Sequence, residues 1–154
     1  MAWITLALRK QTLKAEINSL NYEDIQLSRQ QRAVHRHLSY EQSVFNTEKK
    51  QQLRDAKAAY TEIRNQRPDV KDPDYEQWKT DYAMAQEEYQ AAKENIEDYY
   101  DDVNSDLEAD AQDEEDEIQE QITQVETQRD AMSAELQAIS DQIKTEIDNS
   151  AIKF

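Results

Sequence analysis

The sequence predicts an all-α fold, arranged as a long antiparallel helical hairpin or coiled coil. The 154-residue chain contains no glycine, whereas average composition would place roughly ten in a chain of this length. Residues with high helix propensity, such as Ala, Glu, Gln, Lys and Leu, dominate it. Both prolines lie in one short segment, and apolar residues recur every three or four positions on either side of that segment.

Residues 1–67 are expected to form an N-terminal long helical arm. Apolar residues recur there every seven positions, at Leu6, Leu13, Leu20, Leu27 and Val34. This is the heptad seam of a coiled coil, the line of residues that faces a partner helix, and its phase shifts near Lys49. The seam runs through the helix-start patterns "LNYED" (20–24) and "LSYEQ" (38–42), so one helix is expected through both.

Residues 68–73, "PDVKDP", are expected to form a Pro-bounded turn, because proline interrupts a helix and restricts the residue before it. A second helix should start there, with Asp72 as its N-cap and Pro73 in its first position. A short connection favours antiparallel neighbours.

Residues 74–154 form the C-terminal helical arm of this prediction, which includes an acidic segment at 94–128. Its first apolar run is Trp78, Tyr82, Ala85, Tyr89, Ala92, Ile96, Tyr99 and Val103. A second run, from residue 118 to residue 143, is the clearest in the chain. The stretch between them, 103–117, breaks the phase. The arm is therefore expected to continue as one helix or to kink near residue 104 into two.

The seam residues are the expected interface of the helices, since a narrow apolar stripe needs a partner. The predicted interface residues are Leu13, Leu20, Leu27, Ile122, Val125, Arg129, Met132, Leu136, Ile139 and Ile143. Arg129 is the one charged member of the set. We expect it to set the register by pairing with an acid across the interface.

Charge is distributed unevenly along the chain. The formal net charge is −16, and residues 94–128 hold fifteen of the 34 acidic residues and no Lys or Arg. Residues 1–67 hold twelve bases and seven acids, including Arg29, Arg32 and Arg36. The acidic segment can be a solvated face, a surface that pairs head to tail with the basic arm of a neighbour, or a site for a foreign basic partner or a cation. The acidic excess makes direct nucleic-acid binding unexpected, because phosphate contacts need clustered Lys and Arg.

Motifs for catalysis or for cofactors are not found. The absence of glycine excludes phosphate-binding and dinucleotide-binding loops, and the absence of cysteine excludes disulfides and thiolate metal sites. His35 and His37 are two residues apart, so on a helix they point to nearly opposite sides. Residues 102–113 match the oxygen positions of a calcium loop but have Leu107 where its turn requires glycine. We expect no enzyme activity and no cofactor.

Apolar residues also occupy both ends of the sequence. We expect them to form one cluster, a terminal clasp that holds a neighbouring subunit, made of Trp3, Ile4, Leu6, Leu8, Ile152 and Phe154. The longest apolar stretch, "AWITLAL" (2–8), is too short to span a bilayer, and no basic segment precedes it as in a signal peptide. The expectation is a protein without a signal peptide or a membrane span, cytoplasmic when synthesised.

In overall character the chain resembles the small helical virion and scaffold proteins of tailed bacteriophages. The features that carry this resemblance are the Gln-rich helical stretch "LKAEINSLNYEDIQLSRQQ" and the acidic coiled-coil arm that follows. The resemblance implies a structural component of a larger particle that binds itself or other structural proteins. The alternative is an acidic adaptor or inhibitor that captures a basic partner as a nucleic-acid mimic does. No functional residue is carried over from the resemblance.

Overall fold

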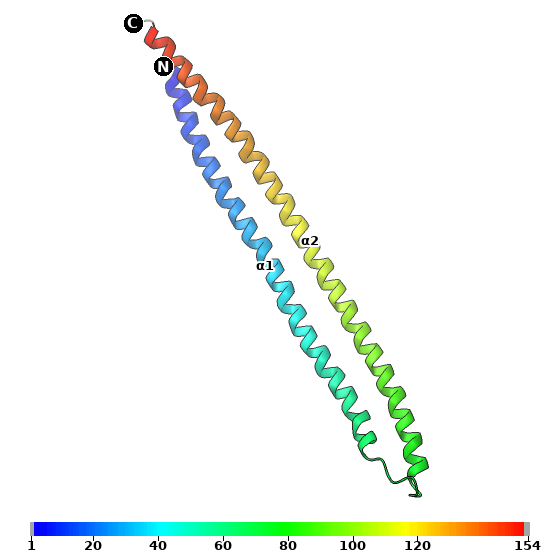
Figure 1. Ribbon diagram of the computed structural model, residues 1–154. Helices are drawn as coiled ribbons and strands as arrows, with labels where there is room; N and C mark the ends of the chain where they lie inside the picture. The colour runs from blue at the N-terminus through cyan, green and yellow to red at the C-terminus, as the bar shows by residue number, and fades with distance from the viewer. Residues whose placement is uncertain (1, 153–154) are drawn as a thin grey trace. The chain divides into compact units, whose positions relative to one another are not determined.

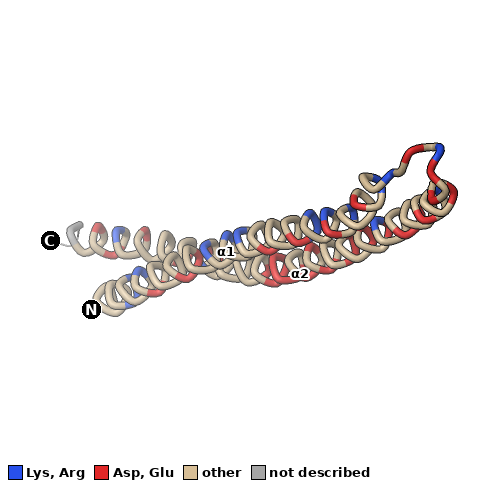
Figure 2. Tube along the Cα trace, turned by 90° about the horizontal axis from the view of Figure 1, so that it is seen from below, with Lys and Arg blue, Asp and Glu red and all other residues tan. Residues whose placement is uncertain are grey.

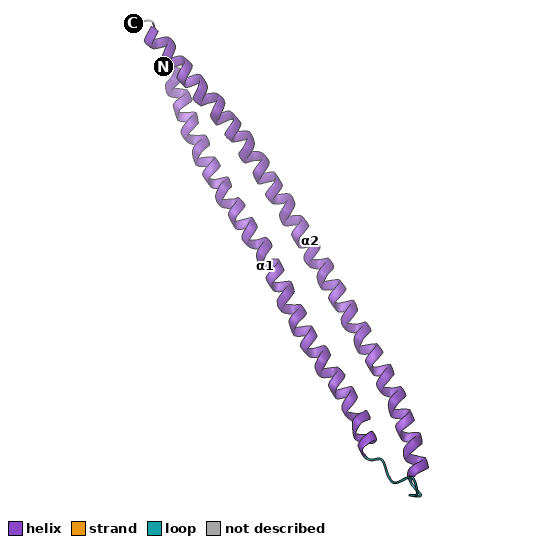
Figure 3. Cartoon of the chain, viewed as in Figure 1, coloured by secondary structure: helices purple, strands orange, loops and turns teal. Residues whose placement is uncertain are grey.

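The computed structural model describes the backbone of residues 2–152 and the side chains of residues 2–150. Two α-helices, α1 (Ala2–Asn65) and α2 (Tyr75–Ile152), make up the described part of the chain together with the loop that joins them. They run in opposite directions and pack against each other, which confirms the all-α helical hairpin (Figures 1 and 3). The chain divides into two compact units, one of residues 1–35 and 112–154 and one of residues 36–111. Neither described helix is long and apolar enough to cross a membrane.

Both helices are continuous. Helix α1 passes through residues 21 and 39 without a break, and α2 passes through the phase break at 103–117. Of the two outcomes expected for the C-terminal arm, the single helix is therefore observed, and the division into two helices is wrong. The segment 103–117 contains neither Gly nor Pro and is rich in Ala, Glu, Leu and Gln, so no residue there forces the helix to end.

The phase change in α2 is absorbed by the spacing of its buried and half-buried positions. The heptad alternation of four and three residues gives way to successive steps of four, through Ile96 and Tyr100 and again through Leu107, Ala111 and Glu115. Extra steps of this kind locally change the winding of a helix pair and keep the helix intact. Helix α1 has matching steps of four through Phe45, Lys49 and Leu53, which is the phase shift expected near Lys49.

Helix α2 begins two residues later than the sequence suggests. The Tyr75 amide donates to the Asp72 carbonyl at 3.1 Å, and the Asp74 amide donates to the Asp72 carboxylate at 2.9 Å, so Asp72 closes a turn. The Asp74 carbonyl accepts the first helical bond, from the Trp78 amide at 2.9 Å. Asp74 is therefore the N-cap residue, and the prediction of Asp72 in that position is wrong.

The first unit has an aliphatic core. Leu27 packs with Ile118, Ile122 and Val125, and the half-buried Leu20 and Val34 lie against this cluster. Leu13 is the only large side chain among the described residues that is fully buried. Each buried aliphatic side chain of this kind contributes about 1.5–3 kcal/mol of transfer free energy.

The second unit buries small and aromatic residues. Ala85, Tyr100 and Ala111 are its buried positions, and half-buried aromatic rings fill the space near the loop. Tyr100 is 5% exposed whereas Tyr99 is 59% exposed. The prediction that Tyr99 lies in the seam is wrong, because the extra step of four residues after Ile96 moves the seam to residue 100.

Candidate functional site

The predicted interface residues face the other helix of the same chain. Leu13, Leu27, Ile122, Val125 and Ile139 are buried. The remaining predicted interface residues are half-buried, and they are Leu20, Arg129, Met132, Leu136 and Ile143. The first unit therefore brings these side chains together as an intrachain core. Whether any of them also contacts another chain stays a prediction.

Charged side chains link the two helices of the first unit. Arg129 Nη1 of α2 lies 3.3 Å from Asp24 Oδ2 of α1 and 3.5 Å from Asn21 Oδ1. Arg9 donates two hydrogen bonds to the Glu135 carboxylate at 3.1 and 3.2 Å. This hydrogen-bonded carboxylate raises the pKa of the Arg9 guanidinium. These pairs connect the helices across the edges of the seam.

His35 contacts a carboxylate of the acidic segment in the first unit. Its Nε2 lies 2.6 Å from Glu115 Oε1, a buried oxygen to which no described group donates a well-aligned hydrogen bond. The contact is thus an ion pair only when His35 is protonated. Arg29, Arg32 and Arg36 have no ion pair within the described residues, so pairing of the acidic segment with the basic arm of a neighbour stays a prediction.

The terminal clasp is only partly described. Trp3, Ile4 and Leu8 are exposed on α1, by 43%, 41% and 65%, and Leu6 is half-buried. The side chain of Ile152 and the whole of Phe154 lie outside the described residues. The structure therefore describes only the N-terminal half of the predicted clasp, an exposed apolar face on the first turns of α1.

A stack of aromatic rings holds the two helices together next to the loop. Tyr60 of α1 lies between Tyr82 and Tyr89 of α2, with ring centroids 5.4 and 5.5 Å apart, and Trp78 stacks on Tyr82 at 5.1 Å. The hydroxyl groups of Tyr60 and Tyr82 share a hydrogen bond of 2.7 Å. That bond, together with burial, raises the pKa of Tyr82. The stack fixes the rotation and register of both helices at this end of the second unit.

Trp78 joins the stack to the end of α1. Its indole Nε1 donates to the Ile63 carbonyl at 2.7 Å, near the C-terminus of α1, and the Gln66 amide donates to the same carbonyl at 3.2 Å. The Arg67 guanidinium lies 5.8 Å from the Trp78 ring centroid and 5.9 Å from that of Tyr75. The loop is therefore anchored by one hydrogen bond and by cation–π contacts.

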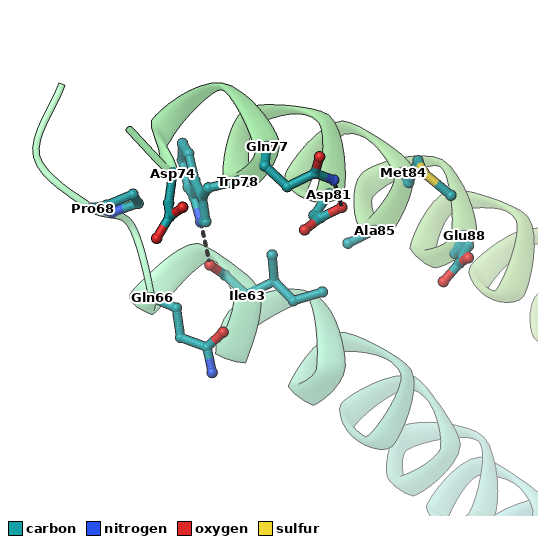
Figure 4. A pocket seen from close by; sticks show the side chains of 10 residues that line it. All are labelled: Ile63, Gln66, Pro68, Asp74, Gln77, Trp78, Asp81, Met84, Ala85 and Glu88. Carbon is teal, nitrogen blue, oxygen red and sulfur yellow. Dashed lines mark hydrogen bonds between the residues drawn. The ribbon is translucent and has the colours of Figure 1, made fainter. Parts of the chain in front are cut away.

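A groove of about 510 Å³ opens beside this anchor, and we call it the tip groove (Figure 4). Ile63, Pro68, Trp78 and Met84 give it apolar walls. Its acidic lining residues are the N-cap Asp74 and, on α2, Asp81 and Glu88. They are seven residues apart, and no Lys or Arg lines the groove. Asp81 Oδ1 accepts a hydrogen bond from Gln77 Nε2 at 3.0 Å, as Figure 4 shows. An apolar wall with regularly spaced carboxylates suits a long basic side chain.

The acidic stretch that matches the calcium-loop template is helical. Residues 102–113 belong to α2, so their oxygen atoms are distributed around a helix and do not converge. Within the described residues, no group of three or more His, Cys, Asp or Glu side chains is arranged to hold a metal ion.

The tip groove is not among the sites expected from the sequence. The seam pattern includes Trp78 and the tyrosines but does not connect them to Ile63 of α1 or to Pro68 of the loop. The seven-residue repeat of Asp74, Asp81 and Glu88, each directly before a seam tyrosine, is the signal that could have indicated an acidic edge. Comparison with known proteins finds no matching family, no matching curated protein and no matching solved structure.

Proposed function

We propose that this chain is a non-enzymatic structural protein whose helices assemble with copies of themselves or with other structural proteins in a larger particle. A bacteriophage virion is the setting that the sequence resemblance suggests. In this proposal the chain is made in the cytoplasm and then incorporated into the particle.

The observation that carries the proposal is the amount of apolar surface left exposed. Within the described residues eleven large hydrophobic side chains are exposed, whereas nine hydrophobic residues are buried and two of these are alanines. Tyr22 and Ile25 are 65% and 51% exposed three residues apart on α1, and Tyr40 is 68% exposed. The accessible surface of the chain is 11455 Å², against roughly 8,000 Å² for a compact monomer of this mass. Association with another chain would cover such side chains.

A second candidate function is an acidic adaptor that captures a basic partner. The observation in its favour is the run of fifteen acids without a Lys or Arg in residues 94–128, whose side chains are mostly exposed. Such a surface speeds encounter with a basic protein and sets its orientation. Under this candidate the chain binds that partner as a monomer.

Sedimentation equilibrium over a range of protein concentrations tests the proposed function. A molar mass that rises with concentration to a multiple of the monomer mass is the expected result. A chain that stays monomeric throughout and binds a basic protein, with an affinity that falls steeply as salt rises, would support the adaptor instead. The 18.1 kDa mass of one chain is the reference for both outcomes.

A further inference from the structure

The two flanks of the helix pair near the loop carry opposite charge. The seam positions of this part are half-buried or buried residues such as Ala56 and Ile63 on α1 and Tyr82 and Tyr89 on α2. Residues directly before a seam position form the acidic flank, and they are Glu48, Asp55, Glu62, Asp74, Asp81 and Glu88. The basic residues directly after a seam position form the basic flank, and they are Lys50, Arg54, Lys57, Arg64, Lys79 and Lys93. Glu76, which follows Tyr75, is an acid on the same side.

Helix geometry places these two sets on opposite sides of the pair. Neighbouring residues of an α-helix are about 100° apart, so the residues before and after a seam position point to opposite flanks. In a parallel pair the residues before the seam lie on opposite sides of the two helices. Reversing the direction of one helix exchanges its flanks, so in this antiparallel pair the residues before the seam on both helices share one side. Near the loop, the Lys and Arg positions gather mainly on α1 and the Asp and Glu positions mainly on α2 (Figure 2). Each flank, acidic or basic, includes residues of both helices of the second unit.

Neither flank is neutralised within the chain. All six acids of the acidic flank are exposed, and so are five of the six bases, Lys93 being half-buried. Within the described residues none of these twelve side chains forms an ion pair. The flanks point away from each other, so a charge on one side has no intrachain partner on the other.

We propose that the tip groove and the acidic flank around it bind the basic flank of a second copy of this chain. This inference rests on the proposed assembly function and gives it a specific contact. The carboxylates of Asp74, Asp81 and Glu88 recur every seven residues, and so do the cations of Lys50, Lys57 and Arg64. Seven residues correspond to roughly 10 Å along a helix, so the two rows have the same period. One copy can therefore present a cation to each carboxylate of the next.

The apolar walls of the groove match the same occupant. Met84, which is 56% exposed, and Pro68 lie beside the carboxylates. The alkyl stems of Lys and Arg cover apolar surface while their charged ends reach an acid. Arg67 already places a guanidinium next to Trp78 within the chain, so the surroundings of the groove accommodate this chemistry.

The contact uses two different surfaces, so it is heterologous. Each copy that offers its acidic flank still has a free basic flank, and the contact repeats from copy to copy. Such a contact closes into a ring or continues as an open array, according to the rotation between neighbours. An isologous dimer would instead use one flank twice, which would bring like charges together.

A charge-swap experiment tests the contact. One variant carries Asp74→Lys, Asp81→Lys and Glu88→Lys, and the other carries Lys50→Glu, Lys57→Glu and Arg64→Glu. Alone, each variant brings like charges together, and its dissociation constant measured by sedimentation at low salt should rise about tenfold or more. Mixed in equal amounts, they should assemble as an alternating array, because each reversed flank then faces an opposite charge on the other variant.

A matched control reverses three acids with the same residue types and spacing elsewhere on α2, by Asp106→Lys, Asp113→Lys and Glu120→Lys. This control should assemble as the unmodified chain does. Where a reversal variant loses its helical circular dichroism, the neutral set Asp74→Asn, Asp81→Asn and Glu88→Gln replaces it. This set should also weaken assembly.

Three results would overturn the inference. Both reversal variants could assemble normally, their mixture could fail to recover, or the control could lose assembly to the same extent. In each of these cases the unmodified chain still assembles and the proposed function stands. An unmodified chain that is monomeric at every concentration would overturn the proposed function together with this contact.

Discussion

Arg129 of α2 reaches across the helix pair to Asp24 of α1, with 3.3 Å between Nη1 and Oδ2, and both residues occupy seam positions. The side chains are 29% and 22% exposed. Two opposite charges thus face each other in a stripe that is otherwise mainly apolar. A half-buried pair of this kind favours one register over its neighbours more than it adds stability.

Removing one member of this pair should cost more than removing both. Arg129→Leu leaves the Asp24 carboxylate half-buried without its cation, and we expect a loss of about 1–2 kcal/mol in the free energy of unfolding. The double variant Asp24→Leu/Arg129→Leu should be at least as stable as the unmodified chain. Urea unfolding followed by circular dichroism measures both. A double variant that is less stable than Arg129→Leu would show that the pair does not act in this way.

Leu13 should be the most sensitive aliphatic position of the first unit, because its side chain is fully buried. Leu13→Ala removes packed methyl groups and leaves a cavity, and we expect a cost of about 2–4 kcal/mol. Leu8→Ala is the matched control, since Leu8 is 65% exposed on the same helix. Its cost should stay within about 0.5 kcal/mol. Equal costs for the two variants would contradict the packing of α1 described above.

The fold was predictable because its main determinants are local. The absence of glycine, the proline pair at 68–73 and the regular seam are all read directly from neighbouring residues. Tyr100 was missed because its burial depends on successive four-residue steps, which keep α2 in contact with α1. The sequence of α2 alone does not distinguish a four-residue step from a break in the helix, because the outcome depends on the position of α1.

The tip groove was not predictable in the same way. It is lined by residues from both sides of the loop, where the indole of Trp78 donates to the Ile63 carbonyl fifteen residues earlier. Nothing in the local sequence of either helix fixes that contact. The opposite flanks, in contrast, follow from the sequence once the antiparallel pairing and the seam positions are known.

The hydrogen bond from Trp78 gives a test of the loop anchor. Trp78→Phe keeps an aromatic ring in the stack but removes one of the two donors to the Ile63 carbonyl, which should cost about 0.5–1.5 kcal/mol. Amide hydrogen exchange should become faster at Gln66, whose amide donates to the same carbonyl at 3.2 Å. Trp3→Phe is the control, because Trp3 is 43% exposed. Unchanged exchange at Gln66 in the Trp78 variant would contradict the anchoring role.

Alkaline pH should loosen the second unit. The hydrogen bond with Tyr60 is the main cause that raises the pKa of Tyr82 above its ordinary value of 10.0, and burial raises the pKa of Tyr100. A raised pKa means that the folded state favours the neutral phenol. This contribution to stability is complete below pH 10 and is lost as the pH rises through the folded-state pKa values.

An absorbance titration of tyrosinate, recorded together with circular dichroism, measures this effect. Replacement of Tyr22, Tyr40 and Tyr99 by phenylalanine is the control, because these three side chains are exposed. The variant Tyr82→Phe/Tyr100→Phe should lack the late part of the titration. Ionisation of all tyrosines in one step, with no change in helicity, would show that the folded state does not protect Tyr82 or Tyr100.

The exposed apolar face on the first turns of α1 should matter for assembly and not for folding. Trp3, Ile4 and Leu8 are exposed, so their replacement by serine removes little intrachain packing. The triple variant should keep nearly all of its helical circular dichroism and lose self-association by about tenfold or more, as expected when apolar anchors leave an interface.

The matched control replaces two exposed apolar residues of the second unit that do not line the tip groove, by Val44→Ser and Val70→Ser, and it should assemble as the unmodified chain does. A second control, Lys10→Ser/Lys14→Ser, changes two bases near the apolar face and leaves its hydrophobic side chains in place. If the triple variant assembles as the unmodified chain does, the clasp does not exist and these side chains are simply solvated. If it loses helix instead, the first turns of α1 depend on these residues for folding.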